Sequence, residues 1–153
     1  MNSNSVNTNP RLPVKQLYIF LAACALIILS SSIDVMIRVK DLDLFDQWRL
    51  ASGIEADVND LFNAYVTISM SIYFFKIIVP IIFGIYCFYA YKKIRVNHLF
   101  VFIWTVLNLG GLAYVLVERQ LGSVFFYLSA VGYLINVIML ISLMDVIKLK
   151  NSK

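Results

Sequence analysis

The sequence has little charge, a single histidine and only two cysteines. Charged residues make up 14% of the chain and hydrophobic residues 61%, against about 25% and roughly 45–50% in an ordinary soluble domain. A soluble fold of 153 residues could not bury this much apolar surface. The composition therefore argues against a soluble enzyme, a disordered chain and a nucleic-acid-binding protein. It predicts an integral protein of the lipid bilayer.

The scarcity of reactive residues limits the chemistry that the chain could perform. The one histidine, His98, leaves no Ser/His/Asp or Cys/His set to assemble, and no glycine-rich phosphate loop is present. Cys24 and Cys87 form no CxxC or Cys/His cluster. Their predicted depths differ by about 9 Å, too far for a disulfide, so we expect free thiols. We therefore predict no catalytic residues, no metal site and no cofactor, and a protein that is not an enzyme.

Four long apolar runs dominate the rest of the sequence, and they occupy residues 17–37, 66–90, 99–117 and 124–144. Each is long enough to cross about 30 Å of hydrocarbon as a helix, whereas strands would leave backbone groups unpaired in lipid. Because the linkers are short, neighbouring helices should be antiparallel. The sequence predicts an all-α antiparallel four-transmembrane-helix bundle, a single domain over residues 17–148.

The N-terminal residues 1–16 are rich in Asn and Ser, and they predict a disordered cytoplasmic tail. A cleaved signal peptide is the alternative for the first apolar run. That run continues past Ser30–Ser32 without an Ala-x-Ala site, which favours a retained helix.

Basic residues predict the orientation of the bundle. Eight Lys and Arg residues flank the side of the two termini, and four flank the other side. By the positive-inside rule both termini face the cytoplasm, in the cell (plasma) membrane. The cluster of Lys92, Lys93 and Arg95 is the clearest marker, and it is also expected to contact anionic lipid head groups.

The loop of residues 38–65 is predicted to be extracytoplasmic, amphipathic and helical. Leu42, Phe45 and Trp48 recur at i, i+3 and i+6, and a second apolar pattern after Gly53 continues into the second run. The first helix would lie at the outer interface with Trp48 at head-group level. Because the loop is acidic, it should either cap its own bundle or meet a partner, and these three residues are the candidate partner segment.

Polar and small residues recur at helical spacing within each run and should face the bundle interior. Lys76, Asn108 and Asn136 lie within about two residues of the centres of their runs. A lysine at this depth needs a partner, and Asp34 is the candidate. The candidate intramembrane polar site comprises Asp34, Tyr73, Lys76, Pro80, Asn108 and Asn136.

Pro80 lacks the N–H that would bond the carbonyl of Lys76, which predicts a kink with a free carbonyl beside the ammonium. Two interpretations stay open. One is a structural kink held by Asn108 or Asn136, and the other is a midplane pocket for a transported or sensed ligand.

These features support two hypotheses on function. The first is a small non-enzymatic membrane protein that acts through contacts with another membrane protein, or with itself, as an accessory, regulatory or immunity-type subunit. The second is a small transporter or channel-like oligomer with a polar site around Lys76.

Overall fold

The computed structural model describes residues 11–117 and 123–151, and every regular element in them is a helix. The helices, in chain order, are α1 (Val14–Lys40), α2 (Leu42–Ser52), α3 (Val58–Lys92), α4 (His98–Val117) and α5 (Val124–Asn151). The all-helical prediction is therefore confirmed.

Four of these helices are long and apolar enough to cross a membrane: α1, α3, α4 and residues Val124–Lys148 of α5. Each contains one of the four predicted runs. The 35 residues of α3 span about 52 Å, well beyond the roughly 30 Å of a hydrocarbon core. One end of α3 must therefore extend outside any bilayer that the other helices cross.

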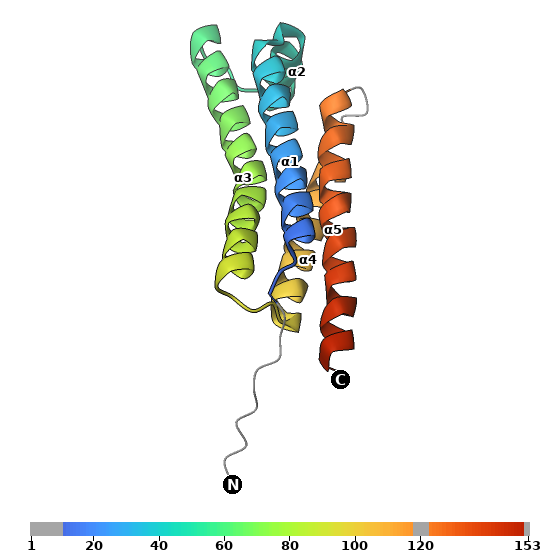
Figure 1. Ribbon diagram of the computed structural model, residues 1–153. Helices are drawn as coiled ribbons and strands as arrows, with labels where there is room; N and C mark the ends of the chain where they lie inside the picture. The colour runs from blue at the N-terminus through green and yellow to red at the C-terminus, as the bar shows by residue number, and fades with distance from the viewer. Residues whose placement is uncertain (1–10, 118–122, 152–153) are drawn as a thin grey trace.

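The four long helices lie alongside one another, and α2 folds back beside one end of α1 and α3 (Figure 1). We call this end of the molecule the α2 end. The opposite end, where residues 93–97 join α3 to α4, is called the turn end. Helix α1 packs mainly against α3 and α5, and α4 packs mainly against α5. Helices α3 and α4 follow each other in sequence but meet over a much smaller area.

The largest apolar cluster lies at the turn end and in the middle of the helices. Phe83 of α3 packs edge-on against Phe20 of α1 at 5.1 Å between ring centroids, and against Trp104 of α4 at 4.9 Å. Leu140, Leu143 and other apolar residues of α5 complete this cluster.

The segment just before α1 belongs to this cluster, which corrects the prediction of a disordered tail to residue 16. Leu12 is 2% exposed and packs in the main apolar cluster. Its amide donates to the carbonyl of Ala90 at 3.3 Å. Helix α1 then begins at Val14, because Pro13 fixes an extended backbone before the first turn. Residues 1–10 lie outside the described residues.

Glycines allow two of the helix pairs to approach closely. A Cβ atom on Gly132 of α5 would lie 2.6 Å from Ile27 Cγ1 and 3.2 Å from the carbonyl oxygen of Ala23, both on α1. A Cβ on Gly111 of α4 would lie 2.5 Å from the ring of Tyr133. Both glycines therefore act as the small-residue pattern predicts, since they let α5 pack closely against α1 and α4.

Candidate functional site

The two predicted midplane asparagines meet between α4 and α5. The side-chain amide of Asn136 donates to Oδ1 of Asn108 at 3.1 Å, and the amide of Asn108 donates to the carbonyl of Trp104 at 2.8 Å. Both asparagines are fully buried. This chain of donors fixes both amide orientations, because turning either amide would bring two oxygens together. Oδ1 of Asn136 has no hydrogen-bond partner among the described residues.

The carbonyl that Pro80 leaves without an amide donor is bonded from another helix. The hydroxyl of Tyr133 on α5 donates to the carbonyl oxygen of Lys76 at 3.3 Å. One interpretation of the sequence has Asn108 or Asn136 bonding this carbonyl. In the structure the two asparagines bond to each other instead. Tyr133 was not among the predicted site residues, although Gly132 beside it marks a close helix contact.

Asp34 is paired along its own helix. Its Oδ2 accepts from Nε of Arg38 at 3.2 Å, and its Oδ1 accepts from the hydroxyl of Ser123 at 3.0 Å. Among the described residues Asp34 forms its ion pair with Arg38 and none with Lys76, so the expected direct Asp34–Lys76 pair is wrong. The physical reason is proximity, since residues four apart on a helix share a face.

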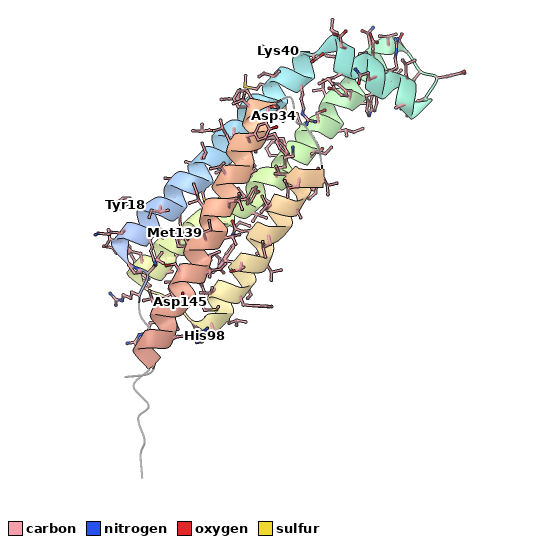
Figure 2. The ribbon with its side chains drawn as sticks, turned by 90° about the vertical axis from the view of Figure 1, so that its right-hand side faces the viewer. Tyr18, Asp34, Lys40, His98, Met139 and Asp145 are labelled. Atoms are coloured by element: carbon pink, nitrogen blue, oxygen red, sulfur yellow. The ribbon has the colours of Figure 1, made fainter. Side chains whose placement is uncertain are left out.

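Asp34 and Lys76 nevertheless line the same small cavities. One of about 20 Å³ is also lined by Ser31 and Ser129, and one of about 30 Å³ by Ser31 and Tyr73. Each is large enough for one water molecule and has polar groups to hold it. Figure 2 shows Asp34 toward the α2 end of the helices.

A third cavity separates α3 from α4. It measures about 100 Å³ and is lined by Phe75, Lys76, Val79, Gly111, Tyr114, Val115 and Tyr133. The ammonium of Lys76 lies 5.7 Å from the centroid of the Tyr114 ring, which is within the range of a cation–π contact. Lys76 therefore lies beside all three of these cavities.

Hydroxyl pairs join α1 to its two main neighbours. Oγ of Ser30 lies 2.7 Å from Oγ of Ser129 on α5, and Oγ of Ser32 lies 2.8 Å from the hydroxyl of Tyr73 on α3. Each α1 serine also donates its only hydroxyl proton to a carbonyl one turn back, Leu26 or Ile28. Ser129 and Tyr73 must therefore be the donors across the helix contacts.

The predicted partner segment folds mostly onto its own chain. Asp41 caps α2 by accepting from the amides of Asp43 and Leu44. Phe45 is 5% exposed and packs with Leu61 and Tyr65 of α3, with Trp48 beside them. Of the three candidate residues, only Leu42, 66% exposed, faces outward. The large exposed apolar residues of α2 are Leu42, Leu44 and Leu50.

The remaining candidates lie at or near the turn end. Lys92, Lys93 and Arg95 are exposed at the α3–α4 turn, and Figure 2 shows His98 at the same end. Cys24 and Cys87 are free and buried, as expected. Within the described part of the chain, no three His, Cys, Asp or Glu side chains are placed to hold a metal ion.

Comparison with known proteins gives no further guide, because no protein-family model, curated protein or solved structure matches the chain.

Proposed function

We propose that the chain is an integral membrane protein of the non-enzymatic type, which acts through contacts with another membrane protein or with a second copy of itself. Its role would be that of an accessory, regulatory or immunity-type subunit. Four helices long enough to cross a membrane support the first part of this proposal.

The observation that carries the proposal is how the interior polar side chains are used. The polar contacts between side chains of different helices include Asn108–Asn136, Ser30–Ser129 and Ser32–Tyr73, which join α4 to α5, α5 to α1 and α1 to α3. These contacts stabilise the helix arrangement rather than surround a common reactive point. In this proposal the helices form an antiparallel bundle, and the protein acts through its outer surfaces.

The proposed placement puts both termini in the cytoplasm and the α2 end outside the cell, in the plasma membrane. The exposed bases Lys92, Lys93 and Arg95 would then meet the anionic head groups of the cytoplasmic leaflet. Helix α2 would be an extracytoplasmic amphipathic helix, with Phe45 turned inward and Leu42 and Leu50 turned to a partner.

The test is purification of the tagged full chain in mild detergent, followed by mass spectrometry and determination of the oligomeric state. We expect a stoichiometric partner or a defined oligomer that a Leu42→Ser/Leu50→Ser variant no longer recovers. Leu99→Ser is the matched control, because Leu99 is 62% exposed at the turn end. Recovery of the lone monomer under several detergents would contradict the proposal.

A second candidate is a small transporter or channel-like oligomer, and the three cavities around Lys76 favour it. Intramembrane charges commonly mark such pathways. Flux of protons and potassium ions into dye-loaded proteoliposomes would test it. This candidate predicts flux that Lys76→Met abolishes while the protein remains folded. Absence of flux, or full flux in Lys76→Met, would leave the cavities with a structural role.

A further inference from the structure

We propose that Tyr133 is a latch on a hinge in α3, and that this latch controls the cavity between α3 and α4. The hinge is the stretch from Lys76 to Pro80. The proposal does not depend on which candidate function is correct, because it concerns how α3 moves.

The hinge follows from the chemistry of proline. Pro80 has no N–H to donate, so the carbonyl of Lys76 lacks its usual helical partner at the middle of a 35-residue helix. A helix with such a gap bends more easily there, and sharp bends are commonly found at proline. The hydroxyl of Tyr133 bonds this carbonyl at 3.3 Å, so one side chain from α5 replaces the missing helical hydrogen bond.

The two halves of α3 share α1 as a neighbour and differ in the second helix that they contact. Toward the α2 end, Tyr73 bonds Ser32 at 2.8 Å, and Tyr65 donates to the carbonyl of Arg38 at 3.1 Å. Toward the turn end, Phe83 packs against both Phe20 and Trp104. The half toward the α2 end is thus attached to α1 and α2, and the other half to α1 and α4. Since aromatic packing ties only the turn-end half to α4, a bend at Pro80 would change the distance between the α2-end half and α4.

The structure also leaves room for such a motion. Helices α3 and α4 meet over a small area, and a cavity of about 100 Å³ lies between them beside Lys76 and Tyr133. The Tyr133 ring reaches the Lys76 carbonyl only because Gly111 has no side chain, since a Cβ there would lie 2.5 Å from the ring. Latch, hinge and cavity therefore share one location, and release of the latch would let α3 bend and change the size of the cavity.

Spin-label distance measurements on the full chain in lipid nanodiscs test this inference. One nitroxide is attached at Asn63→Cys on α3 and the other at Leu116→Cys on α4, both exposed positions toward the α2 end. The native Cys24 and Cys87 are buried, and mass spectrometry verifies that they stay unlabelled. We expect one narrow distance distribution in the parent protein. Tyr133→Phe, which keeps the ring but removes the donor, should broaden or shift it.

The decisive arm combines Tyr133→Phe with Pro80→Ala. Alanine at position 80 restores the amide donor to the Lys76 carbonyl, so the latch becomes redundant and the narrow distribution should return. An unchanged distribution in Tyr133→Phe would overturn the proposal. So would broadening that persists in the double variant, because the hydroxyl would then act elsewhere.

A second pair of variants gives a test that does not depend on whether the Tyr133→Phe variant folds. Gly111→Ala should displace the ring and give the same broadening, while all hydroxyls remain. Gly110→Ala is the matched control, because a Cβ there has no neighbour within 4 Å. The proposal fails if Gly111→Ala behaves like the parent protein, or if both glycine variants broaden the distribution equally.

Discussion

Asn136 donates its side-chain amide to Asn108 at 3.1 Å, between two helices, where neither residue has access to solvent. The two partners are not equivalent. Asn108 also donates to the carbonyl of Trp104, whereas Oδ1 of Asn136 has no partner among the described residues. The interaction is thus a directed chain that ends in an unpaired acceptor.

This asymmetry predicts that Asn108→Ala destabilises the protein more than Asn136→Ala. Asn108→Ala removes the acceptor of the Asn136 amide and leaves that buried group largely unsatisfied, at a cost of about 1–3 kcal/mol. Asn136→Ala removes the bonds to Asn108 and to Sγ of Cys24 (3.8 Å), each worth about 0.6 kcal/mol on average in membranes. It leaves Oδ1 of Asn108 without its donor but also removes the unpaired Oδ1 of Asn136, so the number of buried unpaired groups does not rise. Unfolding in mixed micelles with increasing denaturing detergent measures both free energies. Equal costs would show that the amides are not arranged as described.

The ion pair of Asp34 predicts which residue it is coupled to. In double-mutant cycles we expect Asp34 and Arg38 to show a coupling energy of about 0.5–1 kcal/mol. Coupling energies of interacting residues range over about 0.5–3 kcal/mol. This pair should lie at the lower end of that range because solvent still reaches both side chains, Asp34 being 16% and Arg38 26% exposed. Asp34 and Lys76, which share cavities without a direct ion pair, should couple less than half as strongly. A larger coupling to Lys76 would reinstate the pairing that the sequence suggested.

The positions of the long helices could be predicted from the sequence because a bilayer imposes one length and one polarity on them. All four predicted runs lie within helices of the structure. Helix α3 begins at Val58, eight residues before the apolar run at residue 66, in the segment after Gly53 where the sequence predicts a helix that continues into that run. The outer ends of the other helices could not be predicted in this way, since α1 runs from Val14 to Lys40 and α5 continues to Asn151, and hydropathy does not register such polar turns.

The sequence identified most residues of the candidate site but not which of them contact each other. Asn108 and Asn136 meet as their depth suggested, and Lys76 and Asp34 share cavities. Depth along a helix says nothing of azimuth, however, and the contact with Tyr133 depends on it. The Asp34–Arg38 pair could have been predicted, since residues four apart on a helix share a face. Tyr133 in particular required the position of Gly111 on a neighbouring helix, which no single run of sequence contains.

Leu12 should be essential to the turn end although it precedes the first predicted span. It is 2% exposed, so Leu12→Ala should lower the free energy of unfolding by about 2–5 kcal/mol. Val14 is the control, since it is 46% exposed and Val14→Ala should cost about 0.5 kcal/mol or less. Detergent unfolding with tryptophan fluorescence follows both, because Trp104 lies in the same cluster as Leu12. A neutral Leu12→Ala would place residue 12 outside the core.

Alanine at position 132 should lower the stability of the protein, whereas alanine at position 110 should keep or raise it. At Gly132 the added Cβ would lie 2.6 Å from Ile27 Cγ1 and 3.2 Å from a backbone carbonyl of α1, so α1 and α5 must separate, at about 1–3 kcal/mol. At Gly110 nothing lies within 4 Å, and alanine favours the helix by up to about 1 kcal/mol. Thermal unfolding of both variants in the same detergent should therefore lower the midpoint for Gly132→Ala and keep or raise it for Gly110→Ala. A loss of stability in both would mean that the backbone of α4 is covered at Gly110, as it would be if a second copy of the chain packed there.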